Sequence, residues 1–446
     1  MKKILLIIFI LFIGNNLVSS QGRFVLNYKD NSKINFKLIN NLIVIPVEVN
    51  GVKLSFILDT GVSKPILFNF VNLNEELKIN QTERIYLRGL GEGDSVEALR
   101  SGNNILKVGD AVSIGQDLYA IFDPSLNFAP KLGVPIHGII GYDLFKDFVV
   151  EVNYSTKQLK LHNPDTYVPK KCSKCRTFNL DFNNNKPYID GMVQVSGNTI
   201  PVKLLIDSGG SDALWLFKDD EKGIHLPEKY FEDFLGRGLS GSVYGKRSRI
   251  DGVMFGEFAL RRVNTAFPDS TSISFARKFT ERNGSIGGEV LRRFNVIFDY
   301  PNKQITLRKN KNYKDPFYYN QSGIVLQHNG VRVVKQRNKE IQRVETSYGT
   351  TNESGGGTTI NLTQSYKYVL APSFEVVEIR KDSPAHKAGI ELGDIVLRIN
   401  NKEAHMFTIQ EITQLFYGEA GKRIRMIVDR DGIQMRFSFI LTDLLK

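Results

Sequence analysis

Short runs of alternating apolar and polar residues recur along much of the chain, and this period of two predicts β-strands. In "PVEVNGVKLSFIL" at residues 46–58, two such runs flank Asn50-Gly51, a dipeptide typical of a tight hairpin turn. In "MVQVSGNTIPVKLLI" at residues 192–206, two further runs flank Gly197-Asn198, where we expect the second turn. The pattern therefore predicts a mainly β fold.

The two hairpins belong to a longer internal repeat. Each is followed by Asp-Thr/Ser-Gly, and the two aspartates, Asp59 and Asp207, are 148 positions apart. Three later blocks recur in the same order at offsets of 149, 146 and 146: "RGLGEG" with "RGLSGS", "GIIGYDLF" with "GSIGGEVL", and "FVVEVNYSTKQLKL" with "FNVIFDYPNKQITL". The constant order and nearly constant spacing indicate two copies of one β-rich lobe of roughly 145 residues.

A different pattern follows residue 309. "FEVVEIRKDSPAHKAGIELGDIVLRIN" at residues 374–400 opens as an alternating strand, and its Ser383-Pro384 is typical of a helix start. "FTIQEITQLFYG" has the apolar spacing of an amphipathic helix that begins near Thr408, and Asp431-Gly432 predicts a hairpin. A stretch near residues 335–368 is polar and rich in Gly, Ser, Thr and Asn, so we expect a long loop or a small hairpin there.

The length of 446 residues suits about three domains. We expect a signal peptide at 1–20, a first lobe at 21–166, a second lobe at 167–312 and a third domain at 313–446 that contains the polar insertion. The first twenty residues have a basic start, an apolar run and small residues at the end, as secretory signal peptides do, and an uncleaved membrane anchor is the alternative. The sequence therefore predicts an exported protein, periplasmic or extracellular, with no stable membrane insertion after signal cleavage.

Charge and cysteine content refine this picture only slightly. The formal net charge is +12, but Lys and Arg are scattered, so we expect a solvated basic surface and no nucleic-acid partner. Cys172 and Cys175 are the only cysteines and are too few for a structural zinc site. In an exported protein they suit a small structural disulfide loop, and a redox-active pair is the alternative.

Asp59 and Asp207 are the candidate catalytic residues. Alone, an Asp-x-Gly after a strand is an ordinary turn. Two equivalent carboxylates at about 3 Å separation cannot both ionise, so they share one proton. The ionised member can take a proton from a water that attacks a peptide carbonyl, and the protonated member can hydrogen-bond the carbonyl oxygen and help protonate the leaving amine. The duplicated carboxylate therefore predicts peptide-bond hydrolysis without a metal or an organic cofactor.

The residues beside each aspartate suit this chemistry. Gly61 and Gly209 permit a tight turn and a close approach of the two loops. Thr60 and Ser208 carry hydroxyls that can reach across to the opposite loop and tie the two lobes together.

These motifs resemble those of the retropepsin-like aspartic peptidases, in a single-chain, two-lobe form. The resemblance covers roughly residues 36–308 and rests on the two Asp-Thr/Ser-Gly loops and on "IIG" and "SIG" further along each lobe. It implies the acid-protease fold, in which the later segments pack beneath the catalytic loops. Ser285 departs from the family pattern, which has an apolar residue at that position.

The resemblance also implies two flaps, hairpins that close over the substrate. They correspond to "RGLGEG" and "RGLSGS", which supply the flap residues Gly89, Leu90, Gly91, Gly238, Leu239 and Ser240. Pepsin-like enzymes usually carry Ser or Thr after the catalytic Gly, where a hydroxyl can stabilise the charged carboxylate. Val62 and Gly210 provide no such donor, so we expect the dyad to hold its proton to higher pH, with an activity optimum that is mildly acidic to near neutral.

The region from about residue 323 to 441 resembles a PDZ domain of the kind found in bacterial exported proteases. PDZ domains bind an extended peptide as an added strand, and we expect the groove between the strand at 374–379 and the helix from Thr408. A docking module that only steadies the lobes is the alternative for this domain.

The sequence therefore predicts an aspartic endopeptidase that acts on a peptide or protein substrate and has a PDZ domain for substrate or partner capture. The alternative from another class is a catalytically silent peptide-binding protein that uses the PDZ groove on a protease-like scaffold. The sequence makes no prediction of the oligomeric state.

Overall fold

The structure is a computed structural model, and it describes residues 22–27, 29–68, 77–337 and 366–446. The predicted signal peptide and most of the predicted polar insertion lie outside the described residues. The fold is mainly β, as predicted, with 53% strand and 8% helix. It divides into two compact units, one of residues 1–321 with 442–446 and one of residues 322–441, and each is described by itself.

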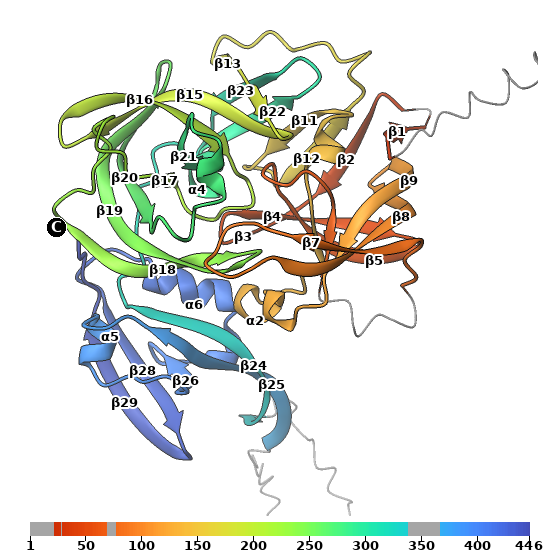
Figure 1. The fold of residues 1–446 in the computed structure, drawn as a ribbon. Helices are drawn as coiled ribbons and strands as arrows, with labels where there is room; N and C mark the ends of the chain where they lie inside the picture. The colour runs from red at the N-terminus through yellow and green to blue at the C-terminus, as the bar shows by residue number, and fades with distance from the viewer. Residues whose placement is uncertain (1–21, 28, 69–76, 338–365) are drawn as a thin grey trace, which may run out of the picture. The chain divides into compact units, whose positions relative to one another are not determined.

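The first unit contains two lobes, each built on one large sheet (Figure 1). Lobe 1 is defined by a nine-stranded sheet: β1 (Phe24–Leu26), β3 (Lys37–Ile39), β4 (Leu42–Val49), β5 (Val52–Leu58), β6 (Ile66–Leu67), β7 (Thr82–Leu87), β8 (Val96–Val108), β9 (Ala111–Ala120) and β10 (Gly138–Ile140). Its short helices are η3 (Pro124–Leu126), α2 (Ala129–Leu132) and α3 (Tyr142–Phe145).

Lobe 2 is defined by an eight-stranded sheet: β14 (Asp181–Asn183), β15 (Lys186–Val195), β16 (Asn198–Ile206), β17 (Leu214–Leu216), β18 (Tyr230–Gly238), β19 (Gly241–Phe255), β20 (Phe258–Pro268) and β21 (Arg282–Ile286). Its short helices are η4 (Ala276–Lys278) and α4 (Gly288–Leu291).

The two sheets repeat one topology. Lobe 2 follows the order β14-β15-β16-β21-β17-β20-β19-β18, and the pairings of lobe 1 give β3-β4-β5-β10-β6-β9-β8-β7. In both lobes the strand that leads to the aspartate pairs in parallel with a later strand, β5 with β10 and β16 with β21. The internal repeat of the sequence is thus a repeat of the fold.

Each aspartate-bearing strand enters through a two-residue hairpin. In lobe 1 the turn is Asn50-Gly51, with φ of 48° and 90°. In lobe 2 it is Ser196-Gly197, with φ of 48° and 83°, and Val195 pairs with Asn198. The second turn therefore lies one residue earlier than predicted. Both hairpins place positive φ at the two central residues, which matches the right-handed twist of the strands, and Gly at the second position accepts it without strain.

A six-stranded sheet joins the two lobes. Its order is β13-β23-β22-β11-β12-β2, and it contains β2 (Asn31–Asn35), β11 (Val149–Asn153), β12 (Gln158–His162), β13 (Cys175–Asn179), β22 (Phe294–Asp299) and β23 (Gln304–Lys309). The central pair is β11 with β22, antiparallel, and Glu151 lies opposite Ile297. These two residues are equivalent in the repeat, so the pseudo-two-fold axis passes between them. One continuous hydrophobic core runs through both lobes and this sheet.

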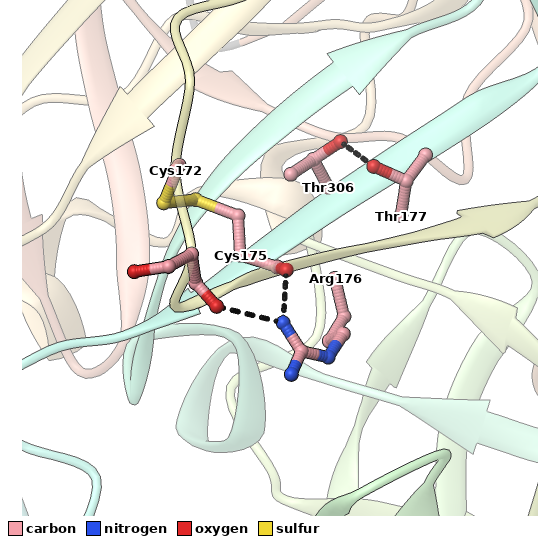
Figure 2. The surroundings of a disulfide bond; sticks show 6 residues. Cys172, Cys175, Arg176, Thr177 and Thr306 are labelled. Carbon is pink, nitrogen blue, oxygen red and sulfur yellow. Dashed lines mark hydrogen bonds between the residues drawn. A yellow bond between two sulfur atoms is a disulfide. The ribbon is translucent and has the colours of Figure 1, made fainter.

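A disulfide links Cys172 to Cys175, the first residue of β13 (Figure 2). The guanidinium of Arg176 closes the small loop by donating hydrogen bonds to the carbonyl oxygens of Ser173, at 2.9 Å, and Cys175, at 2.7 Å. Beside it, the hydroxyls of Thr177 and Thr306 lie 2.8 Å apart across β13 and β23. The cysteines thus fasten the edge of the sheet where lobe 2 begins.

The second unit is an α+β domain with its own core. Its sheet has the order β24-β25-β26-β28-β29, with β27 beside β26. The elements are β24 (Ile324–Arg337), β25 (Tyr366–Ile379), α5 (Pro384–Lys387), β26 (Ile395–Ile399), β27 (Lys402–Glu403), η5 (Ala404–Met406), α6 (Ile409–Phe416), β28 (Arg423–Arg430) and β29 (Ile433–Ile440). Thr408 and Glu411 form a capping box at the start of α6, where the sequence places the helix.

None of the helices in the described part of the chain is long and apolar enough to cross a membrane.

Candidate active site

Asp59 and Asp207 occupy equivalent loops at the ends of equivalent strands. Asp59 follows β5, and its main-chain N–H donates to the carbonyl of Ile140 at 2.8 Å. Asp207 follows β16, and its N–H donates to the carbonyl of Ile286 at 2.9 Å. The segments "IIG" and "SIG" thus lie directly beside the two aspartate loops and fix where each strand ends.

Four hydrogen bonds join the two loops across the pseudo-two-fold axis. The Thr60 hydroxyl donates to the carbonyl of Ile206 at 2.6 Å and accepts from the N–H of Ser208 at 3.0 Å. The Ser208 hydroxyl donates to the carbonyl of Leu58 at 2.7 Å and accepts from the N–H of Thr60 at 3.0 Å. Thr60 and Ser208 are fully or almost fully buried. Because buried hydrogen-bonding groups are costly to leave unpaired, this reciprocal pattern holds the two loops in one relative position.

The two catalytic-loop glycines leave room for the carboxyl groups. A β-carbon on Gly209 would lie 2.3 Å from Cγ and Oδ2 of Asp59, so only a glycine lets that carboxyl group take its place. A β-carbon on Gly61 would lie 3.1 Å from Oδ1 of Asp59 and 3.4 Å from Oδ1 of Asp207. Both carboxyl groups therefore converge on the space above Gly61.

The surroundings of Asp59 favour its protonated form. Burial and the negative charge of Asp207 raise the pKa of Asp59 to about 7. The N–H of Gly61, which donates to Oδ1 of Asp59 at 2.7 Å, and the charge of Lys186 act in the opposite direction. Burial and the negative charge of Asp59 raise the pKa of the nearby Tyr300 hydroxyl. The pair can therefore hold one proton between two carboxyl groups over a wide pH range.

A second pair of contacts supports the loops from the outside. The side-chain amide of Asn41, between β3 and β4, donates to the carbonyl of Ser211 at 2.9 Å. The hydroxyl of Ser63 donates to the carbonyl of Asn184, between β14 and β15, at 3.0 Å. Each lobe thus extends a hairpin tip to the loop that follows the other lobe's aspartate.

The two predicted flap segments meet at their tips. The first flap is the hairpin β7–β8 with its tip at 88–95, and the second is the hairpin β18–β19 with its tip at 237–242. Ser240 makes three of the contacts: its hydroxyl accepts from the N–H of Gly89 at 3.0 Å, its N–H donates to the carbonyl of Leu90 at 2.9 Å, and its carbonyl accepts from the N–H of Gly93 at 2.7 Å. The N–H of Gly91 donates to the carbonyl of Ser272 at 3.0 Å.

Close packing at the tips requires glycine at several of these positions. A β-carbon on Gly89 would lie 2.8 Å from Cβ of Leu239, and one on Gly238 would lie 2.3 Å from the carbonyl oxygen of Leu90. The leucines cross over: Leu90 packs against apolar clusters of lobe 2, and Leu239 packs against an apolar cluster of lobe 1. Each flap therefore contacts the opposite lobe.

Comparison with known protein families agrees with this geometry. Residues 45–144 match the family model of an aspartyl protease, and residues 375–430 match that of a PDZ domain. The chain contains an aspartyl protease domain and a C-terminal PDZ domain. The resemblance identified in the sequence is thereby confirmed, and the protein is related to peptidase hydrolases in general. A search of curated proteins found no match.

The matched part of the aspartyl protease domain lies in lobe 1 and includes Asp59 and the first flap. Asp207 and the second flap enter the site through the internal repeat and through the hydrogen bonds described above. Within the described part of the chain, no group of three or more His, Cys, Asp or Glu side chains is arranged to hold a metal ion.

The structure adds two basic residues to the protease site that the sequence analysis did not single out. Lys186 begins β15 and Arg282 begins β21, and their charges act on Asp207. Lys186 follows Asn184-Asn185 just as Leu42 follows Asn40-Asn41. An alignment of the two lobes through these asparagine pairs places Lys186 opposite Leu42. This segment lies upstream of the blocks that reveal the repeat, so those blocks give no sign of the difference.

The predicted position of the PDZ groove is wrong. Strand β25 is paired with β24 from Tyr366 to Ile379 and also with β26 at Glu375, so residues 374–379 offer no free edge. The edge strand is β24, and α6 packs against it. An added peptide strand would therefore pair with β24, beside α6.

Proposed function

We propose that the protein is an exported aspartic endopeptidase in which a water activated between Asp59 and Asp207 hydrolyses peptide bonds. The observation that carries this proposal is the convergence of the two carboxyl groups above Gly61, held by four reciprocal hydrogen bonds between the loops. Fixed geometry of this kind is what acid–base catalysis on a bound peptide requires.

In the proposed reaction the dyad enters with one proton. The ionised carboxylate removes a proton from the water as its oxygen bonds to the peptide carbonyl carbon, and the protonated carboxyl group hydrogen-bonds the carbonyl oxygen. The tetrahedral intermediate then breaks its C–N bond, and the amine leaves with a proton from the dyad. Because burial and the charge of Asp207 raise the pKa of Asp59 to about 7, the pair can enter the reaction with one proton, which the two carboxyl groups share.

Two observations support export. The N-terminal segment has the pattern of a signal peptide, and Cys172 and Cys175 form a disulfide, a bond that persists mainly in oxidising compartments. In the proposed protein the PDZ domain captures a substrate or partner peptide along the edge of β24, and the two lobes contain the whole catalytic pair.

The decisive experiment is incubation of the purified protein with a diverse peptide mixture, with and without pepstatin, read by mass spectrometry. Wild type should cut peptides, and Asp59→Asn and Asp207→Asn should each leave no measurable turnover, because one carboxyl group cannot be both base and acid. Asp190→Asn is the matched control: this exposed carboxylate on β15 forms an ion pair with Lys203, at 3.5 Å, so its loss should leave cleavage unchanged.

Circular dichroism of each variant would establish that the fold is intact. Undiminished cleavage by either dyad variant would contradict the assignment of the catalytic pair. A folded wild-type protein that cuts nothing but binds peptides would support the alternative of a peptide-binding protein.

A further inference from the structure

The strand register exposes a difference between the two lobes beside the catalytic pair. In lobe 1, Ile43 and Leu58 are the next residues after the pair Val44–Ile57, so Leu42 stands opposite Asp59. In lobe 2, Tyr188 pairs with Leu205, and the same register places Lys186 opposite Asp207. Directly opposed residues of an antiparallel pair share a face and have β-carbons about 5 Å apart. Lys186 thus occupies the position in lobe 2 that Leu42 occupies in lobe 1.

The difference between the lobes at Leu42 and Lys186 extends to neighbouring residues on the same face of the sheet. In lobe 1, Ile57 pairs with Ile139, and both belong to an apolar cluster with Leu42 and Val44. In lobe 2, Leu205 pairs with Ser285, the residue that departs from the family pattern. Lobe 1 therefore lines its side of the catalytic pair with apolar side chains, whereas lobe 2 places Lys186 and Ser285 among its apolar side chains.

Arg282 explains why a serine stands at position 285. Its guanidinium donates to the Ser285 hydroxyl at 3.4 Å and to the carbonyl of Gly284 at 3.1 Å, and it lies 5.1 Å from the centre of the Phe217 ring. Arg282 is only 7% exposed. An apolar side chain at 285 would leave part of this buried cation without a hydrogen-bond acceptor.

The two cations lie close enough to repel one another. Burial and the charge of Arg282 lower the pKa of Lys186, while the charges of Asp207 and Asp59 oppose that change. Among the described residues, the ammonium group of Lys186 forms neither an ion pair nor a hydrogen bond. Two partly desolvated cations beside one another are unfavourable, and a substrate carboxylate placed beside them would relieve both the repulsion and the desolvation cost.

Both faces lie beneath a flap tip. Leu239 packs against the apolar cluster of lobe 1 that contains Leu42, and Leu90 packs against Phe217 and its neighbours in lobe 2, near Arg282. A peptide bound between the flaps and the aspartates would extend in opposite directions over these two faces, with the scissile bond at the axis.

We propose that the enzyme selects a peptide bond with an acidic side chain on one side and an apolar side chain on the other, and that Lys186 and Arg282 bind the acidic side chain. This inference rests on the proposed peptidase function. It names the substrate class of that site, with glutamate or aspartate over lobe 2 and an aliphatic or aromatic residue over lobe 1.

The test uses matched peptides that carry Glu, Gln or Leu at each of the two positions flanking the cleaved bond. At one of these positions wild type should show a kcat/KM about 10 to 100 times higher for Glu than for Gln, the range of a charge-assisted hydrogen bond. The two kcat/KM values are measured with the same enzyme at the same pH, so any change in the protonation of the dyad affects both equally and cancels in their ratio.

Lys186→Leu introduces the residue that lobe 1 has at this position, Leu42. It should abolish most of the preference for Glu over Gln and raise the relative kcat/KM for the peptide with Leu at the same position. Lys186→Gln keeps a polar side chain and should also lose the preference for Glu over Gln, which separates charge from packing. Lys222→Leu is the matched control, because it removes one exposed lysine of lobe 2 outside the site and should keep the wild-type ratio.

Three outcomes would overturn the inference. Wild type that cuts Glu, Gln and Leu peptides equally at both positions would refute it and leave the peptidase proposal intact. So would an acidic preference that survives unchanged in folded Lys186→Leu and Lys186→Gln. Failure of wild type to cut any peptide would remove the proposed function itself, and the inference with it.

Discussion

Leu42 and Lys186 stand at equivalent positions in two lobes whose strands follow the same order and whose catalytic loops make the same hydrogen bonds. The shared features are those that place the two carboxyl groups: the parallel strand pairs, the cross-loop hydroxyls and the glycines. The features that differ line the faces beside the carboxyl groups. The comparison indicates that placing the aspartates constrains both lobes alike, while the adjoining faces are free to differ.

The catalytic-loop glycines Gly61 and Gly209 are equivalent in the repeat, but they have different neighbours. A β-carbon on Gly209 would overlap the carboxyl group of Asp59, whereas one on Gly61 would lie at a tight contact distance from both aspartates. We therefore expect Gly209→Ala to lower kcat/KM by about 100-fold or more, since a displacement of about 1 Å in a reacting group can cost that much. Gly61→Ala should lose distinctly less. The measurement is steady-state cleavage of one fixed peptide by each variant.

Both variants also need a check of the fold by circular dichroism and thermal unfolding. Equal losses for the two glycines would mean that the carboxyl groups are placed symmetrically, against the geometry described here. Gly51→Ala is not a suitable control because its φ of 90° strains any other residue. Gly210→Ala suits better, since its β-carbon would make only ordinary contacts, at 3.5 Å, with Asp207.

The cross-loop hydroxyls should contribute alike from the two lobes. Thr60→Val removes the acceptor for Ser208 N–H and the donor to Ile206, and Ser208→Ala does the same for Thr60 N–H and Leu58. Each leaves two buried main-chain groups unpaired, so each should lower the free energy of unfolding by about 2–5 kcal/mol. Urea unfolding, followed by circular dichroism, would measure it.

The conservative exchanges Thr60→Ser and Ser208→Thr keep a hydroxyl in each loop and are the controls. They should retain most of the stability lost in the first two variants. A difference of several kcal/mol between Thr60→Val and Ser208→Ala would show that one loop carries most of the connection.

The smallest expected effect concerns pH. Because Asp59 has a raised pKa of about 7, it keeps its proton through the mildly acidic range and loses it as the pH rises through about 7. Above that pH both carboxyl groups are ionised and the acid is lost, so kcat/KM should fall on the basic side near pH 7. A pH profile with one fixed peptide would measure this, and an optimum at pH 2 to 3, within the range of about 1.5 to 4.7 that the pepsin pair spans, would contradict it.

Gly210→Ser sharpens this prediction. Its β-carbon would lie 3.5 Å from Cγ and Oδ2 of Asp207, so the added hydroxyl can donate to that carboxylate and favour its charged form. The acidic limb of kcat/KM should then move to lower pH by about one unit or less, the value of one hydrogen bond. Gly210→Ala adds the same β-carbon without a donor and should leave the limb in place.

Much of the protease domain could be predicted from the sequence because the repeat carries it. Asp59 and Asp207 stand in blocks that recur at nearly constant offset, and the residues next to them must be small or hydroxylated for the loops to meet. Local chemistry and duplication both indicated the same residues, and the structure brings them together. The flap segments were found in the same way.

The acidic-substrate inference needed the structure, because Lys186 lies outside the recurring blocks and gains its meaning only from the strand register. Arg282 is likewise distant from Lys186 in sequence, and only the pairing of β16 with both β15 and β21 brings the two together. An isolated lysine at a strand start gives no signal in a chain with 59 basic residues.

The misplaced PDZ groove has a different cause. The strand at 374–379 could be predicted from its apolar alternation. The strand that pairs with it, β24, is separated from it in sequence by the polar insertion and carries no motif. Pairing between strands that are distant in sequence decides which of them is left at the edge, and a pattern along one strand does not report that.

The antiparallel pair β11–β22, at the centre of the sheet between the lobes, affects how activity depends on protein concentration. The two halves of the catalytic pair are connected by one chain, so their encounter does not depend on the concentration of the protein. A half-site enzyme made of two separate chains would fall apart on dilution and lose activity with the square of its concentration. Here the specific activity should stay constant down to the lowest concentration at which the chain remains folded.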